Sequence, residues 1–543
     1  MGVKYFFSWF KKSFSKHIKT IRYREKVSVS IDTFLIDLNG ILHYCAQKAF
    51  RYGAFKGGEK LPYNRQLAYF LDQTGEYINH LVSIVQPQKK LVICIDGVAP
   101  VSKQFQQRQR RYKSSEIDFD SNCITPGTKF LDNLSNYLEW FIRLKLTKDP
   151  SWNFEVIFSN EKVPGEGEHK LVKYVRLYGD ENDHYMIHGM DADLIMLALA
   201  SQRENFHILR ENPYKNEFFH IDMKSIRENL VYTLLQEPTM KKEQFFINDF
   251  ILMMFMSGND FLPNLPTIDI LEGSIETFFD VYRRTVSSYG NLVTPYFTID
   301  TKPLSILLGT LASDEKSILE ERRKHLKDSL LEKHTTLINK DPETYQLNWE
   351  EYRKEYYTKL NCHSEKDIEK VCIQYLEGMQ WVLTYYLEGV SSWVWYYPHS
   401  YAPFCSDIQK YCKNIEKIVS SDKPYDPLFQ LLCVLPPKSA SLLPEALQSI
   451  FENPKTSIYY PKETQIDMDG KRNEWEGIVK LPLIDHFILH KEYKKKLSSI
   501  DQRDKYRNKI DTSKIYTKSS EFYKYKSYHG ELNCNVIVKN IDL

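Results

Sequence analysis

Seven acidic residues of this chain stand where apolar runs end or glycine-rich turns begin, and carboxylates placed in this way can bind metal ions. Asp37 ends the run Phe-Leu-Ile-Asp, and Asp96 ends the similar run Val-Ile-Cys-Ile-Asp. The whole set is Asp37, Asp96, Glu166, Glu168, Asp191, Asp193 and Asp260. Each one alone is better explained as a helix cap or a turn residue. The repetition of the pattern favours a shared site.

Carboxylates gathered in one cleft repel one another, which raises their pKa values and destabilises the fold unless cations neutralise them. Mg²⁺ and Mn²⁺ are the expected cations because they prefer oxygen ligands. Two such ions can hold the attacking water and the leaving 3′ oxygen of a phosphodiester in line. The acidic set therefore predicts a two-metal nuclease or phosphatase.

A basic helix follows Asp96 directly. In the stretch 99–113, Lys103, Gln107, Arg110 and Arg111 have the spacing i, i+4, i+7 and i+8, which places them on one helical face. Arg supplies forked donors and Lys a point charge, a combination suited to a terminal phosphate. An isolated Arg-rich helix is more often a solvated surface, but its position beside an acidic site favours a pocket for a 5′-monophosphate. Such a pocket would set the polarity of cleavage and exclude capped ends.

The elements that must position these residues alternate between β-rich and helical segments up to about residue 290. Expected strands cover 31–37, 91–96, 154–159, 184–188 and 206–210. This order predicts an α/β fold with a mainly parallel sheet flanked by helices, and such sheets bind ligands beyond the carboxyl ends of their strands. The expected divisions are a nuclease domain at 1–290, a charged helical linker at 291–350, a mostly helical, aromatic-rich region at 351–490 packed on the nuclease domain, and a basic, tyrosine-rich and partly disordered tail at 491–543.

Composition narrows the class of protein. The chain has 543 residues, a net charge of only +2 and nine cysteines without a Cys-x-x-Cys pair, which argues against a disulfide framework and a structural zinc site. No apolar run approaches the ~20 residues that cross a bilayer, and no secretion signal is evident. We expect a soluble protein of a reducing compartment, the cytoplasm first and the nucleus as the alternative.

Several stretches resemble the Xrn-type 5′→3′ exoribonucleases, in that family's order and over most of residues 1–490. They are Asp-Leu-Asn-Gly-Ile-Leu-His (37–43), Ile-Asp-Gly-Val-Ala-Pro (95–100), Gln-Gln-Arg-Gln-Arg-Arg (106–111), Phe-Asp-Ser-Asn-Cys-Ile-Thr-Pro-Gly-Thr (119–128), Val-Pro-Gly-Glu-Gly-Glu-His-Lys (163–170), Asp-Ala-Asp-Leu-Ile-Met (191–196), Gly-Asn-Asp-Phe-Leu-Pro (258–263), Gly-Val-Ser-Ser-Trp-Val-Trp-Tyr-Tyr-Pro (389–398) and Cys-Val-Leu-Pro-Pro (433–437).

The resemblance implies processive hydrolysis of 5′-monophosphorylated single-stranded RNA to nucleoside 5′-monophosphates. It further implies that the seven acids bind the metals, that the basic helix holds the 5′-phosphate, and that His43 and either Trp393 or Trp395 sandwich the first base. Without it, a core histidine and a core aromatic cluster are the better interpretations. A monomer acting in mRNA decay beside the decapping machinery follows from the same resemblance.

The chain also departs from the family. Lys4 stands where the family usually has proline, the charged insertion expected after Tyr112 is nearly absent, and the large C-terminal domains of long members do not follow. Two other functions stay open: a flap-endonuclease-like enzyme acting on DNA structures, and an inactive RNA-binding decoy. The decoy is disfavoured because loss of catalysis removes the reason to keep mutually repelling carboxylates.

Overall fold

A mostly parallel sheet forms the centre of the fold. The computed structural model describes residues 2–58, 61–113, 119–212, 215–237, 242–338, 344–413 and 415–543. Within these residues nine strands pair in the order β1-β7-β6-β5-β2-β3-β4-β12-β13. Their bounds are β1 (Ile18–Arg22), β2 (Thr33–Asp37), β3 (Lys90–Cys94), β4 (Glu155–Ser159), β5 (Tyr185–His188), β6 (Phe206–Glu211), β7 (Glu217–Asp222), β12 (Ser513–Ser527) and β13 (Gly530–Ile541).

The five strands expected from the sequence are present and parallel to one another. β2 pairs with β3 and β5, β3 with β4, and β5 with β6. Residues of β2 such as Leu35 and Ile36 are fully buried, as expected of a central parallel strand covered on both faces. Because Asp37 is in register with Cys94, the acids that follow these strands lie at one edge of the sheet.

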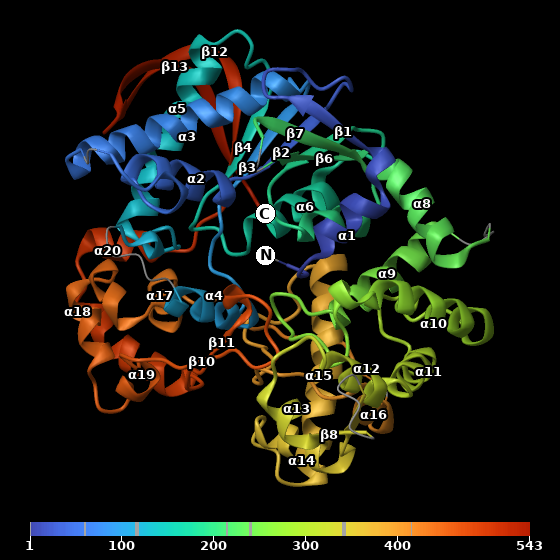
Figure 1. Cartoon of the computed structure of the whole chain (residues 1–543). Helices are drawn as coiled ribbons and strands as arrows, with labels where there is room; N and C mark the ends of the chain where they lie inside the picture. Colours follow the sequence, from blue (N-terminus) through green and yellow to red (C-terminus); the bar gives the residue numbers. More distant parts are fainter. Residues whose placement is uncertain are drawn as a thin grey trace.

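Helices cover both faces of the sheet (Figure 1). One face packs on α2 (Asn39–Phe50), α3 (Tyr63–Val85) and α5 (Lys129–Lys148). The other packs on α1 (Phe6–Ser13), α6 (Gly167–Tyr178), α7 (Asp193–Ala200), α8 (Met223–Leu235) and α9 (Glu243–Met256). Strand residues alternate between the two cores: Leu35 and Val92 belong to one, Phe34 and Ile93 to the other. The predicted α/β class is confirmed.

A helical, aromatic-rich region continues the second core. Its helices are α10 (Ser274–Tyr289), α11 (Thr301–Ala312), α12 (Glu315–Arg322), α13 (Ser329–His334), α14 (Trp349–Thr358), α15 (Glu365–Leu387) and α16 (Cys405–Lys410), with a small β8 (Thr335–Leu337)–β9 (Tyr345–Leu347) pair. α15 begins at a capping box formed by Ser364 and Asp367. Trp381 and Tyr385 of this helix are completely buried in the same cluster as the β-sheet residue Leu35.

The charged stretch inside the expected 291–350 linker does not form a single solvated helix. Two short helices, α12 and α13, lie there instead, and their Leu319 and Leu331 are buried. The charge-rich composition concealed these apolar positions because Lys, Arg and Glu occupy the exposed faces of both helices. The domain boundaries at 290 and 350 stay predictions, although one core cluster runs across both.

A third cluster contains α17 (Pro427–Val434), α18 (Glu445–Gln448) and α19 (His486–Lys496), next to α20 (Gln502–Arg507). The basic helix α4 (Val101–Lys113) lies between this part and the rest (Figure 1). It packs on α17 and on the β10 (Ile466–Asp467)–β11 (Ile478–Val479) pair.

The expected disorder of the tail is wrong. β12 and β13 form a hairpin, and β12 extends the sheet by pairing antiparallel with β4. The outer part of β12 alternates Tyr and Lys over residues 523–526 and is mostly exposed, so the apolar pattern on which the prediction relied is weak. No helix in the described part of the chain is long and apolar enough to cross a membrane.

Candidate active site

The N-terminus of α6 joins the first two acids. The Gly167 N–H donates to Oδ1 of Asp96 at 2.7 Å. A Cβ added at Gly167 would lie 2.8 Å from Oδ1 of Asp37 and 3.4 Å from Oδ1 of Asp96. Glycine is therefore required there, and Asp37 and Asp96 meet at the end of the helix that carries Glu166 and Glu168.

Glu166 and Glu168 flank the first residue of α6, and both are buried. The amides and dipole of the helix N-terminus favour negative charge at this position. Glu168 Oε2 has no hydrogen-bond partner among the described residues, so a buried carboxylate oxygen faces this site unsatisfied.

The chain start reaches the next pair of acids. Asp193 opens α7, and its Oδ1 accepts a hydrogen bond from the Val3 N–H at 3.2 Å. Gly2, at φ 51°, packs so closely that an added Cβ would lie 1.8 Å from Oδ1 of Asp193. The Asp193 N–H in turn faces Oδ1 of Asp191 at 3.4 Å.

Lys103 joins the acidic set to the basic helix. Its Nζ lies 2.5 Å from Oε2 of Glu166 and 2.6 Å from Oδ2 of Asp260. All three side chains are buried. Burial disfavours the charged amine, but Asp260 and Glu166 outweigh it and hold the pKa of Lys103 well above its ordinary value. Burial also opposes ionisation of Asp260, yet the charge of Lys103 contributes to a pKa of Asp260 well below its usual range.

The remaining acids show the repulsion that the sequence predicted. Burial, followed by the charge of Asp96, raises the pKa of Asp37 to about 7. Burial, followed by the charge of Asp191, raises the pKa of Asp193 to about 7. Glu168 is raised well above its ordinary pKa by burial and by Asp191 and Asp193. The fold therefore holds together carboxylates whose mutual repulsion a bound cation would relieve.

The donor set fits a divalent cation by its chemistry. It offers buried carboxylate oxygens, one of them unsatisfied at Glu168, and Mg²⁺ and Mn²⁺ take such ligands. In the described residues no three His, Cys, Asp or Glu side chains are close enough together to hold one ion as they stand.

The predicted phosphate-binding face lies on α4 beside the acids. Lys103, Gln107 and Arg111 are buried, whereas Arg110 is exposed. Arg111 donates from Nη2 to Thr125 Oγ1 at 2.8 Å, but its Nη1 and the Gln107 Oε1 have no partner within the described chain. Burial, and then the charge of Arg110, lowers the pKa of Arg111 to about 9. An anion would satisfy the Arg111 Nη1 donor, whereas the Gln107 Oε1 acceptor needs a hydrogen-bond donor.

The opposite face of α4 is fixed by the third cluster. Arg108 donates from Nη1 to the Pro482 carbonyl at 2.6 Å. The Gln109 side chain exchanges two hydrogen bonds with the backbone of Val479, at 2.8 and 2.9 Å. These contacts hold the helix in place and leave Lys103 and Arg110 directed at the acids and the cavity.

The two tryptophans differ in their surroundings. The ring of Trp395 stacks on Trp381 with centroids 5.4 Å apart and an interplanar angle of 23°, so the partly buried Trp395 packs against the core. Trp393 contacts no aromatic ring among the described residues, and its carbonyl accepts from the Val101 N–H at the start of α4 at 2.8 Å. His43 lies near the same helix, because burial and the charges of Arg110 and Arg111 lower its pKa to about 4.

Sequence reasoning missed two tyrosines of α15. The Tyr385 hydroxyl donates to Oε1 of Glu166 at 2.9 Å, and a hydrogen bond links Tyr386 to Asp193. The His169 ring stacks on Tyr385 at 3.7 Å and 8°. The adjacent tyrosine pair was visible in the sequence, but nothing in its spacing points to acids more than 190 residues away.

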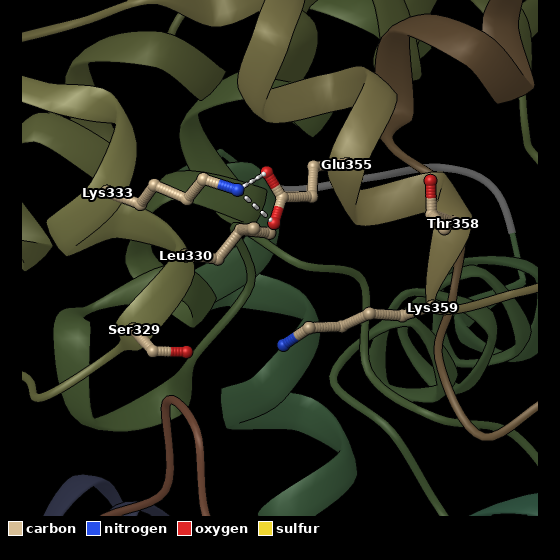
Figure 2. Close-up of a pocket in the computed structure, with 6 residues that line it drawn as sticks. All are labelled: Ser329, Leu330, Lys333, Glu355, Thr358 and Lys359. Atoms are coloured by element: carbon tan, nitrogen blue, oxygen red, sulfur yellow. Dashed lines mark hydrogen bonds and ion pairs between the residues drawn. The ribbon is translucent and has the colours of Figure 1, made fainter.

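Two cavities of the described structure can be compared as candidate sites. A cavity of about 1400 Å³ is lined by Arg110, Asp191 and Asp260 and continues along the N-terminal segment. A smaller one of about 440 Å³ lies between α13 and α14 (Figure 2). There the Lys333 Nζ is already paired with both carboxylate oxygens of Glu355, at 2.6 and 2.8 Å. The larger cavity is therefore the candidate active site.

Buried carboxylates lie at the carboxyl ends of the parallel strands, and a lysine ties them to a basic helix, an arrangement typical of a nuclease. Comparison with known proteins specifies which kind. The family model described as XRN 5′-3′ exonuclease N-terminus matches residues 1–118 and 114–212, and the one described as Xrn1 helical domain matches 240–348 and 333–540. The chain belongs to the Xrn family of 5′→3′ exonucleases.

Named relatives agree with this assignment. The chain is 29% identical to 5′-3′ exoribonuclease 1 of Homo sapiens, over 96% of this chain and 36% of the relative. It is 28% identical to 5′-3′ exoribonuclease 2 of Gallus gallus, over 94% of this chain and 71% of the relative. Among solved structures, the catalytic core of Rad2 in complex with DNA substrate covers 65% of this chain and 94% of its own at 14% identity, with a TM-score of 0.32. A TM-score of this size does not establish a common fold.

Proposed function

We propose that this protein is a 5′→3′ exoribonuclease that hydrolyses 5′-monophosphorylated single-stranded RNA one nucleotide at a time. The observation that carries the proposal is the double ion pair of Lys103. Because this lysine of α4 contacts both Glu166 and Asp260, the basic helix and the acids belong to one site. The relatives named above are exoribonucleases, which supports the same function.

In the proposed reaction a water molecule attacks the phosphorus of the first phosphodiester, and the bond to the 3′ oxygen breaks. The 3′ oxygen takes up a proton, and the products are a nucleoside 5′-monophosphate and an RNA shortened by one nucleotide with a new 5′-phosphate. Two divalent cations, Mg²⁺ or Mn²⁺, would be held by the seven acids and supply activation of water and stabilisation of the leaving oxygen.

Residues of α4 would select the 5′ end of the RNA. Gln107, Arg110 and Arg111 would bind the 5′-monophosphate, and Lys103 would shift part of its contact from Glu166 and Asp260 to a phosphate oxygen. Because the Trp395 ring stacks on Trp381, whereas the Trp393 ring has no aromatic partner in the described chain, Trp393 is the better candidate to stack with His43 on the first base. A closed pocket around the phosphate would exclude capped and triphosphorylated ends.

The test uses purified protein on single-stranded RNA with a 5′-monophosphate, the same RNA with a 5′-triphosphate, and a DNA flap. We expect rapid release of mononucleotides from the first RNA only, and no release with a chelator. Equal degradation of both RNAs would contradict the phosphate pocket, and preference for the flap would favour the DNA-nuclease alternative. We further propose a cytoplasmic monomer acting in mRNA decay after decapping, which localisation and sedimentation measurements can test.

A further inference from the structure

The ammonium group of Lys103 bridges two of the predicted metal ligands. Its Nζ lies 2.5 Å from Oε2 of Glu166 and 2.6 Å from Oδ2 of Asp260. The lysine side chain is 11% exposed and those of its two partners are 4% and 6% exposed, so water screens the three charges little. Both carboxylates are therefore already paired with a cation, and that cation belongs to the protein itself.

A divalent cation would need the same carboxylate oxygens. The other oxygen of Glu166, Oε1, already accepts a hydrogen bond from the Tyr385 hydroxyl at 2.9 Å, so Oε2 is the one that Lys103 and a metal would share. A metal ion bound there would lie beside the lysine ammonium, and like charges repel strongly where little water separates them. A cation that binds Glu166 and Asp260 must therefore displace Lys103.

The displaced ammonium has one nearby destination, which is the proposed 5′-phosphate pocket. Gln107, Arg110 and Arg111 follow Lys103 on the same face of α4. A lysine carries its point charge on a flexible four-carbon stem, so the ammonium can turn along this face without movement of the backbone.

The pocket accepts a third positive charge only together with an anion. After burial, the charge of Arg110 is the main cause that lowers the pKa of Arg111, so the two guanidinium groups already repel each other. The ammonium of Lys103 would add to this repulsion. A bound 5′-monophosphate, which carries about two negative charges, reverses the sign and attracts all three groups.

The two positions of Lys103 exclude each other, and this links the two ligands. A cation on Glu166 and Asp260 releases the ammonium for the phosphate, and a phosphate that attracts the ammonium frees the carboxylates for the cation. By thermodynamic linkage each ligand then raises the affinity for the other by the same factor.

We propose that Lys103 competes with the divalent cation for Glu166 and Asp260 and thereby couples metal binding to binding of the 5′-monophosphate end of the RNA. This inference rests on the proposed function, which supplies both ligands. Its consequence is a second source of end selectivity. An RNA without a 5′-monophosphate leaves Lys103 on the carboxylates, so the cation is held weakly and cleavage is slow even where the strand enters the site.

The test measures Mn²⁺ affinity by titration calorimetry at about pH 8, where ordinary carboxylates are ionised. Wild type is compared with Lys103→Met, which removes the charge, and with Lys103→Arg, which keeps it. Lys514→Met is the matched control, because Lys514 of β12 loses an ion pair with Glu139 at 2.6 Å. Each protein is titrated alone, with a nuclease-resistant phosphorothioate RNA trinucleotide that carries a 5′-monophosphate, and with the same RNA carrying a 5′-hydroxyl. Circular dichroism first shows that each variant is folded, and Lys103→Gln replaces Lys103→Met if the latter is not.

Without RNA, we expect Lys103→Met to bind Mn²⁺ at least about tenfold more tightly than wild type, because the competing ammonium is gone. Lys103→Arg and Lys514→Met should bind it as weakly as wild type. In wild type the 5′-monophosphate RNA should tighten Mn²⁺ binding at least about tenfold more than the 5′-hydroxyl RNA does. In Lys103→Met most of this difference should disappear.

Unchanged or weaker Mn²⁺ binding by Lys103→Met would overturn the inference, because the lysine would then orient the acids rather than compete for them. An undiminished difference between the two RNAs in this variant would overturn it as well. If wild type binds Mn²⁺ but does not distinguish the two RNAs, the proposed 5′-phosphate pocket fails instead, and the titrations without RNA still decide whether Lys103 competes with the cation. Absence of Mn²⁺ binding by wild type would contradict both the proposed function and the inference.

Discussion

The hydroxyl of Tyr385 donates a 2.9 Å hydrogen bond to Oε1 of Glu166, so a helix of the second region fixes a carboxylate of the first. The other oxygen of Glu166 contacts Lys103 at 2.5 Å. Each of the two carboxylate oxygens of Glu166 is thus held by a partner from a different part of the chain. The helical region does more than cover the nuclease core, because it determines where one predicted metal ligand points.

Replacing Tyr385 with Phe removes this hydrogen bond and leaves the buried ring in place. We expect Mn²⁺ to bind at least about tenfold more weakly, as for other partners that orient metal ligands. Titration calorimetry on the metal-free protein measures the Mn²⁺ affinity. We expect kcat for RNA degradation to fall as well. Tyr460→Phe is the matched control, because that buried hydroxyl donates to the Leu432 carbonyl in the third cluster. Identical Mn²⁺ affinities for the two variants would show that Tyr385 does not orient Glu166.

Replacing Asp193 with Asn should abolish RNA degradation and stabilise the metal-free fold. Burial and Asp191 raise the pKa of Asp193 in the folded protein to about 7, so the folded state disfavours its charge. This destabilisation is fully present above about pH 7 and is absent below the unfolded pKa near 3.8. The variant should therefore gain on the order of a few kcal/mol at about pH 8, and nothing near pH 3.

Urea unfolding in the presence of a chelator measures that gain. Asp280→Asn, a change of an exposed helix residue, is the control and should leave activity unchanged. If Asp193→Asn is instead less stable than wild type at about pH 8, the neighbours of Asp193 stabilise its charged carboxylate, and the prediction is wrong.

Replacing Arg111 with Gln tests the end selectivity. Its Nη1 is buried without a partner in the described structure, and we assign it to the 5′-phosphate. We expect kcat/KM on monophosphorylated RNA to fall about tenfold to a hundredfold, the effect of one lost charge-assisted contact of roughly 1.5 to 3 kcal/mol. The preference for the monophosphate over a 5′-hydroxyl end should shrink by the same factor. Loss of activity on both ends equally would instead indicate damage to the acids.

A row of three histidines, two of them buried, predicts acid sensitivity of the fold. His207 Nε2 faces His184 Nδ1, and His207 Nδ1 faces His220 Nε2, each at 3.3 Å. Burial first, and then neighbouring positive charge, lowers the pKa of His207 and of His220 to about 4. The folded protein keeps both neutral, so their contribution is complete above the unfolded pKa near 6.5 and is lost as the pH falls toward 4.

We expect the free energy of unfolding of wild type to fall by a few kcal/mol over that window relative to a His207→Gln variant, which should be less stable at neutral pH and flatter below it. Because raised carboxylate pKa values act in the opposite direction, the difference between the two proteins is the quantity to measure. Parallel pH profiles would show that the row of histidines does not control acid unfolding.

Much of the fold was predictable because local patterns carry it. The five parallel strands were predicted from uniform apolar runs, because a strand that is buried on both faces carries apolar side chains on both. The hairpin at 513–541 was not predictable, because its long strands are half exposed and their order comes from pairing with β4. The prediction for the two short helices at 315–334 failed for a related reason, because their few buried leucines stand among many charged residues.

The sequence by itself determined which residues could do chemistry: seven carboxylates after apolar runs and a helix with one basic face. These depend on residue type and on spacing within a single element, which the chain carries locally. Only the tertiary structure decided how they meet. It placed Lys103 between Glu166 and Asp260, packed Trp395 against the core and Trp393 beside α4, and brought Tyr385 to Glu166 across 219 positions. Such contacts join elements far apart along the chain, and their geometry follows from the packing of whole helices rather than from any spacing that a sequence can show.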